Sequence, residues 1–121
     1  MKEITAIIRT NKIQRTKDAL VEAGYPSMTV KEVMGRGKQK GLQQELSLSE
    51  AELPDEAEVQ VHFIPKRMLT LMATDDSVAE LVKIITEVNQ TGYVGDGKII
   101  VSPLTDAARV RTGELGDSAL T

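Results

Sequence analysis

The sequence repeats one strand–helix–strand pattern, and this repetition restricts the fold more than any other feature. In the first half, "EITAIIR", residues 3–9, is a β-branched run that predicts a strand. Apolar residues at helical spacing follow, with a cap expected at Asn11 and a stop at Gly24. The alternation in "MTVKEVM", residues 28–34, predicts a second strand.

The second half follows the same plan. The segment "RMLTLMAT", residues 67–74, predicts a strand, and Ser77 with Glu80 forms the pattern of a capping box. Helical spacing then continues towards Gly92, and "GKIIVSP" predicts a last strand. Two such units predict an α+β, ferredoxin-like double βαβ fold, with a four-stranded antiparallel sheet and both helices on one face.

The chain length of 121 residues suits a single domain, residues 1–121. Residues 36–60 have no convincing period, and a connection of that length is usually functional or disordered. Its acidic residues, which include Glu45 and Asp55, are accompanied by no Lys or Arg between residues 42 and 60. The tail, about residues 104–121, has so little apolar content that we expect it to lie against a neighbour.

Composition excludes several functions. A net charge of -3 and a pI near 5.2 argue against a nucleic-acid-binding surface, which is usually basic. The chain has no cysteine and one histidine, so disulfides, thiolate metal sites and histidine clusters are excluded. The absence of a signal-peptide pattern or a long apolar run predicts a cytoplasmic protein without membrane insertion.

Two glycine-rich stretches carry lysines. In "GRGKQKG", residues 35–41, the glycine spacing is one residue too long for a dinucleotide fingerprint, which leaves a phosphate cradle or a solvated loop. In "GYVGDGK", residues 92–98, the P-loop spacing is met, but Ile99 stands where a P-loop needs Ser or Thr. This stretch is therefore either a plain turn or a set of backbone amides that faces an anion.

Arg109 and Arg111 are two residues apart in "ARVRTGE", so an extended tail would project both to one side, as a phosphate clamp requires. Taken alone they could be solvated. Together with the two glycine turns they suggest a composite site for a nucleotide polyphosphate. No carboxylate pair, Ser/His/Asp set or thiol accompanies these residues, so the pattern favours binding over catalysis.

The order of these motifs resembles the PII nitrogen-regulatory signal proteins. The C-terminal signature is "TGYVGDGKIIVSP" followed by "ARVRTGE", while "GRGKQKG" and "FIPKR" are similar to the base and return of that family's long T-loop. The resemblance covers nearly the whole chain, including "MKEITAIIR" and "MTVKEVM". It implies a non-enzymatic sensor that assembles as a trimer, with the T-loop at about residues 36–60.

The resemblance also implies ligands and their sites. ATP or ADP would bind at clefts between subunits, with 2-oxoglutarate and Mg2+ beside ATP. Nucleotide-binding positions would be Thr29, Gly35, Gly37, Lys38, Met72, Gly95, Asp96, Gly97 and Lys98, with Arg109 and Arg111 reaching across from a neighbouring subunit. Gln39 would ligate the metal, and Gln39, Lys40, Gly41 and Lys66 would bind 2-oxoglutarate.

The loop lacks the tyrosine that is uridylylated in many members, and its length and acidity resemble the nitrogenase-associated branch. That branch implies a homotrimer or mixed assembly with a sister chain and direct, reversible inhibition of dinitrogenase. The alternatives are a general PII protein acting on an ammonium transporter or an assimilation enzyme, and a slow ATP-hydrolysing enzyme.

Overall fold

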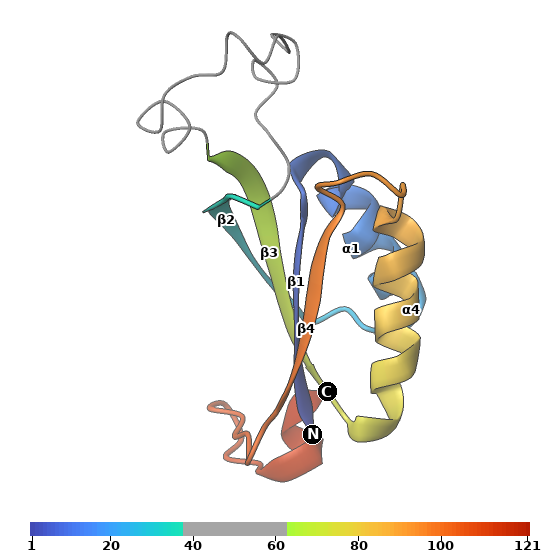
Figure 1. Ribbon diagram of the computed structural model, residues 1–121. Helices are drawn as coiled ribbons and strands as arrows, with labels where there is room; N and C mark the ends of the chain where they lie inside the picture. The colour runs from blue at the N-terminus through green and yellow to red at the C-terminus, as the bar shows by residue number, and fades with distance from the viewer. Residues whose placement is uncertain (38–62) are drawn as a thin grey trace, which may run out of the picture.

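A computed structural model describes residues 1–37 and 63–121, which form an antiparallel four-stranded sheet with two α-helices on one face (Figure 1). The sheet has the order β2-β3-β1-β4, so the two edge strands are the second strand of each half. The strands are β1 (Lys2–Arg9), β2 (Thr29–Gly35), β3 (Ile64–Ala73) and β4 (Gly97–Pro103), and the α-helices are α1 (Ile13–Glu22) and α4 (Val78–Asn89). The prediction of a ferredoxin-like α+β fold is confirmed.

The core lies between the sheet and the helices. Alternate residues of the central strand β1 point to this side, and Ile4, Ala6 and Ile8 are buried while their neighbours are partly exposed. Leucines and isoleucines from β3 and both helices complete the core: Leu20, Leu69, Leu71, Leu81 and Ile85. Each such burial contributes about 1.5–3 kcal/mol, which fixes the strand register because a slip by one residue would turn the set outward.

The predicted helix caps are wrong at both N-termini. A 3-10 turn, η1 (Thr10–Lys12), precedes α1, and no side chain caps the helix, so Asn11 does not have the predicted role. A similar turn, η3 (Asp75–Ser77), precedes α4. Ser77 Oγ lies 3.0 Å from Thr74 Oγ1, and Glu80 accepts a hydrogen bond of 2.6 Å from the Tyr25 hydroxyl, so the capping box is not formed.

The predicted stop at Gly24 is confirmed. Gly24 has φ 97°, which favours glycine, and the following Tyr25 N–H donates to the Leu20 carbonyl at 2.8 Å. This turn leads from α1 to β2. Residues 36–60, the predicted connection between the halves, are described only at 36 and 37, and the rest lies outside the described residues.

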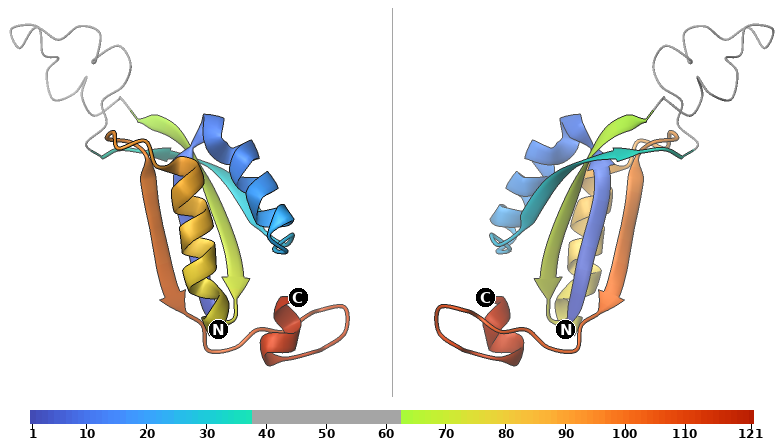
Figure 2. Two further views of the ribbon diagram at one scale, coloured as in Figure 1. Left: turned by 90° about the vertical axis from the view of Figure 1, so that its right-hand side faces the viewer. Right: turned by 90° about the vertical axis from the view of Figure 1, so that its left-hand side faces the viewer.

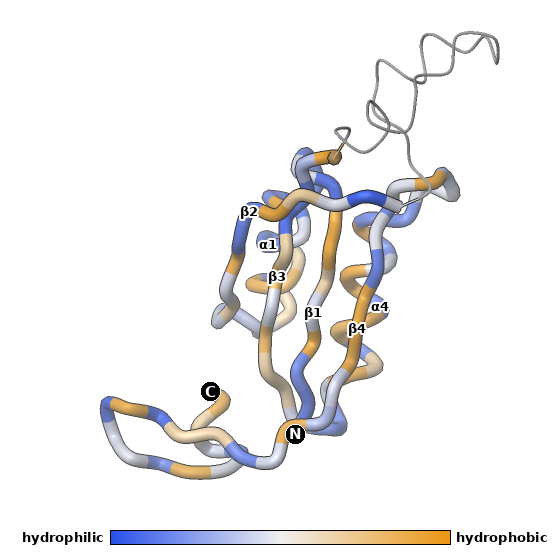
Figure 3. The backbone as a smooth tube through the Cα atoms, turned by 60° about the vertical axis from the view of Figure 1, so that its left-hand side comes forward, coloured by the Kyte–Doolittle hydropathy of each residue, from blue (hydrophilic) through white to orange (hydrophobic). Residues whose placement is uncertain are grey.

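Among the described residues, no α-helix covers one face of the sheet (Figure 2). We call it the open face. Apolar residues are exposed on it, including Met72 and Ile100. Figure 3 shows the backbone from this side, with each residue coloured by its hydropathy. We call the end of the sheet that joins residues 38–62 the loop end, and the end that bears both termini the tail end (Figure 1). Within the described residues, neither helix has the length and apolar character to span a membrane.

Candidate functional site

The turn between α4 and β4 is organised by Asp96. Its Oδ2 accepts hydrogen bonds from the Thr91 N–H at 2.7 Å and the Gly92 N–H at 2.9 Å, and its Oδ1 accepts from the Thr91 hydroxyl. These bonds stabilise the carboxylate, with help from nearby Arg9, and lower the pKa of Asp96 to about 2. The glycines permit the turn, because Gly92 and Gly95 have φ 89° and 102°.

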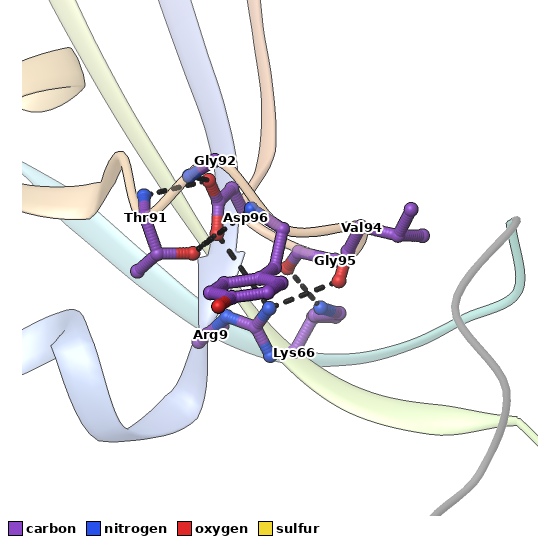
Figure 4. Close-up of polar contacts among 8 residues, drawn as sticks. Arg9, Lys66, Thr91, Gly92, Val94, Gly95 and Asp96 are labelled. Carbon is purple, nitrogen blue, oxygen red and sulfur yellow. Dashed lines mark hydrogen bonds and ion pairs between the residues drawn. The ribbon is translucent and has the colours of Figure 1, made fainter. Parts of the chain in front are cut away.

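Two cations lie beside this turn (Figure 4). Lys66 donates to the Gly95 carbonyl at 2.6 Å, and Arg9 donates to the Val94 carbonyl at 3.0 Å. Arg9 Nη2 is also 3.5 Å from Asp96 Oδ1. Partial burial, and then repulsion by Arg9, lower the pKa of Lys66. Two positive charges thus lie beside one carboxylate, which already accepts several hydrogen bonds. Because one positive charge is not balanced by this carboxylate, the arrangement suits an added anion.

The sheet places the glycines of both halves near these cations. Gly35 ends β2, and a Cβ there would lie 3.6 Å from Lys66 Cγ, so the start of the long connection is beside Lys66. Gly97 begins β4 opposite Ile8. Its φ is 118°, and a Cβ there would lie 2.0 Å from the Ile7 carbonyl oxygen, so glycine is required. Lys98 pairs with Ile7 and is exposed.

A groove of about 820 Å³ lies at the tail end. Thr29 and Met72 line it from β2 and β3, and Arg109 lines it from the tail. The C-terminal 3-10 helix η4 (Gly116–Leu120) contributes Ala119 and Leu120. Apolar side chains, hydroxyl groups, the Asp106 carboxylate and the Arg109 guanidinium line the groove, which suits a flat ring system that carries polar groups.

The tail has more local structure than its composition predicted. Residues 110–112 form a turn, closed by hydrogen bonds between Arg109 and Glu114 and from Gly113 to Arg109. Arg109 and Arg111 therefore do not lie in an extended segment, and that premise of the predicted clamp is wrong. Arg109 is half-buried and bonded to Glu114, whereas Arg111 is exposed in the turn.

The predicted site residues thus fall into two groups. Gly35, Gly37, Lys66, Gly95, Asp96, Gly97 and Lys98 gather at the loop end, and Thr29, Met72 and Arg109 line the groove at the tail end. Lys38, Gln39, Lys40 and Gly41 lie outside the described residues. Strand β4 separates the groups by about 20 Å, at about 3.3 Å per residue. One chain therefore does not bring the two groups together.

Two residues of this region were missed in the sequence. Arg9 lies directly opposite Lys66 in the β1–β3 pairing, and Thr91 holds Asp96. Arg9 is the last residue of β1, and Lys66 lies near the start of β3. Because the two strands run antiparallel, these positions could have indicated that the two cations face each other. No comparable signal marks Thr91.

Metal binding by the protein alone has no support in the described ranges. Within residues 1–37 and 63–121 there is no group of three His, Cys, Asp or Glu side chains that could hold an ion. Mg2+ commonly takes only one or two protein ligands when phosphates supply the others. A single amide at Gln39 with nucleotide phosphates would fit that pattern.

Comparison with known proteins gives consistent matches over the full length. The sequence model of the family "Nitrogen regulatory protein P-II" matches residues 1–114. A Methanobacterium ivanovii protein, "Nitrogen fixation nifHD region GlnB-like protein 2", is 48% identical over 122 residues, covering 99% of each chain. The "Nitrogen regulatory protein P-II" of Mesorhizobium japonicum is 42% identical over 120 residues, covering 99% of this chain and 100% of the relative.

The fold agrees with a solved structure. A crystal structure of Arabidopsis thaliana PII bound to citrate superposes with a TM-score of 0.74 at 31% identity, covering 99% of this chain and 89% of that chain.

A second relative with the nitrogen-fixation-region description, from Methanosarcina barkeri, is 43% identical over 122 residues, covering 99% of each chain.

Proposed function

The chain belongs to the nitrogen regulatory protein P-II family, and on that basis we propose that it is a non-enzymatic sensor of ATP or ADP and 2-oxoglutarate. Two of the relatives above, from Methanobacterium ivanovii and Methanosarcina barkeri, are described by their place in nitrogen-fixation regions, which supports a regulator of nitrogen fixation. The proposed output is direct, reversible inhibition of dinitrogenase. A pull-down with dinitrogenase at low and high 2-oxoglutarate tests this target against a transporter or an assimilation enzyme.

The observation that carries the proposal is the division of the predicted site between opposite ends of the sheet. The loop end offers glycine turns and Lys98, and the tail end offers a groove with Arg109. Each is half of a nucleotide site: the loop end suits phosphates, and the tail end suits the base and adds Arg109 as a further cation for the phosphates. We propose that the loop end of one subunit meets the tail end of the next.

Self-assembly through the open face would produce such clefts. The exposed fractions of Met72 and Ile100 are 46% and 44%, high for large apolar residues on a sheet. A closed ring in which each open face turns inward would bury these side chains and repeat one head-to-tail contact. We therefore propose a trimer, either of identical chains or mixed with a sister chain, as the resemblance implies.

The 2-oxoglutarate site is proposed at Lys66, with Gln39, Lys40 and Gly41 closing over it. Support comes from the paired cations Lys66 and Arg9, which can bind a carboxylate through charge-assisted hydrogen bonds. Mg2+, held by Gln39 and nucleotide phosphates, would offset the repulsion between a triphosphate and a dicarboxylate. This coupling makes 2-oxoglutarate binding dependent on ATP.

Binding without turnover is favoured by the state of Asp96. It is the acid inside the glycine turn, and its oxygens accept hydrogen bonds from Thr91 and Gly92. Its pKa of about 2 makes it a weak base at neutral pH. We therefore propose that Asp96 shapes the turn for a nucleotide and does not activate a nucleophile.

A mixing experiment tests the composite site. Lys98→Ala impairs the loop half and Arg111→Ala the tail half, and we expect each variant alone to bind ATP weakly. The two variants are then unfolded and refolded together. If subunits mix at random, about one cleft in four combines an intact loop end from one chain with an intact tail end from another, so that fraction of sites should bind ATP normally. Refolding each variant alone is the control. No recovery in the mixture would contradict a site shared between subunits.

A further inference from the structure

Arg109 is already bound by anionic and carbonyl acceptors of its own tail. Its Nη1 lies 2.7 Å from Glu114 Oε1, and its Nη2 donates to the Ser118 carbonyl at 3.0 Å. Nη2 also donates to the Thr121 carbonyl. The exposed fraction of the Arg109 side chain is 22%. A phosphate that approaches Nη1 or Nη2 therefore competes with these existing partners.

The contact between Arg109 and Glu114 is fixed by the backbone. The Arg109 N–H donates to the Glu114 carbonyl at 2.9 Å, and the Gly113 N–H donates to the Arg109 carbonyl at 2.7 Å. An isolated bridge between Ala108 and Leu115 continues the pairing. Gly113, with φ 75°, permits the reversal. These backbone contacts hold Glu114 beside Arg109.

We propose that Glu114 is an internal competitor for nucleotide phosphate at Arg109. This inference rests on the proposed nucleotide site. A carboxylate and a phosphate present the same kind of oxygen acceptor to a guanidinium, so Glu114 competes with a phosphate for the face of Arg109 at Nη1. Arg111, exposed in the same turn, meets the phosphates first, and Arg109 follows when Glu114 leaves. The contact therefore raises the nucleotide concentration that is needed to occupy Arg109.

ATP titration of a Glu114→Ala variant tests the competition. Loss of a partly exposed ion pair should tighten ATP binding by roughly two- to fivefold. Asp117→Asn is the matched control, because it removes one negative charge from the same tail, and Asp117 forms no ion pair within the described part of the chain. We expect its affinity to stay near that of the unchanged protein. Equal or weaker ATP binding by Glu114→Ala overturns the inference.

Trypsin digestion provides a readout without nucleotide. Because trypsin must capture the arginine side chain, cleavage after Arg109 should be several times faster in Glu114→Ala than in the unchanged protein, with Asp117→Asn unchanged. Cleavage after the exposed Arg111 is the internal reference. Equal cleavage after Arg109 in all three proteins contradicts the contact. Failure of every protein to bind ATP contradicts the nucleotide site itself, whereas ATP binding that ignores Glu114 overturns only the competition.

Discussion

The fold lowers the pKa of Asp96. Hydrogen bonds from Thr91 and Gly92 stabilise its charged form and lower its pKa from 3.8 to about 2. Because the pKa of Asp96 is lower in the folded protein than in the unfolded chain, its charged carboxylate stabilises the fold, and this stabilisation is fully present above pH 3.8. Its contribution is lost as the pH falls from 3.8 through about 2.

A pH titration by NMR checks this. The amide signals of Thr91 and Gly92 should shift with a midpoint near pH 2, because their acceptor is protonated there. In an Asp96→Asn variant the same signals should not titrate in this range. A midpoint near 3.8, the ordinary value, would mean that the bonds do not favour the charged carboxylate.

Gly97 has no acceptable replacement at its position in the sheet. Its φ of 118° disfavours other residues, and a Cβ would lie 2.0 Å from the Ile7 carbonyl oxygen. Gly97→Ala should lower the free energy of unfolding by about 1–3 kcal/mol from the backbone alone, with a further loss from the clash. Denaturant unfolding measures the change.

Gly24→Ala is the matched control, since Gly24 has φ 97° but no atom within 4 Å of a Cβ. It should show the backbone cost without the clash. Equal destabilisation by the two substitutions would contradict a steric role for Gly97 in the pairing of β1 and β4.

The two helices are joined in the core by a polar contact between Asn89 of α4 and Thr16 of α1. Asn89 Nδ2 donates to Thr16 Oγ1 at 3.0 Å, and Thr16 donates to the Lys12 carbonyl at 2.8 Å. Asn89 and Thr16 are both buried. Removing either partner leaves a buried polar group without that bond.

A double-mutant cycle measures this contact. Thr16→Val should destabilise the protein by about 1–2 kcal/mol, because Asn89 loses an acceptor. In an Asn89→Leu background the same change should cost much less, since no donor remains to be satisfied. Equal costs in the two backgrounds would show that the side chains do not interact.

The elements were predictable where burial decides them. The β-branched run at 3–9 predicted β1, whose alternate residues are buried, and Gly24 correctly marked the end of α1. The predicted caps failed because both helices begin through 3-10 turns. At the start of α4, Ser77 bonds to Thr74, and Glu80 in the first turn of the helix accepts a bond from Tyr25. A contact such as that of Glu80 with Tyr25 joins residues that are distant in sequence, so a local sequence pattern cannot predict it.

At the scale of the molecule, the sequence nominated candidate site residues but did not indicate how the fold arranges them. Both glycine stretches were noticed from their spacing, and of these the described residues Gly35 and 92–98 lie at the loop end. Arg9 was missed because its role appears only when β1 pairs with β3. The extended Arg109–Arg111 clamp was wrong because the tail turns back and Glu114 bonds to Arg109.

We propose that nucleotide and 2-oxoglutarate bind side by side near Lys66 and that each raises the affinity for the other. Coupling of this kind requires that one ligand change the affinity for the other. The Lys66→Ala variant should bind 2-oxoglutarate roughly 10- to 100-fold more weakly, because a charge-assisted hydrogen bond is lost. Lys83→Ala, on the exposed side of α4, is the control and should bind normally.

Calorimetric titration of 2-oxoglutarate with and without Mg-ATP tests the claim most directly. We predict binding heat in the presence of Mg-ATP, and none in its absence. Binding of equal affinity under both conditions would contradict the coupled site.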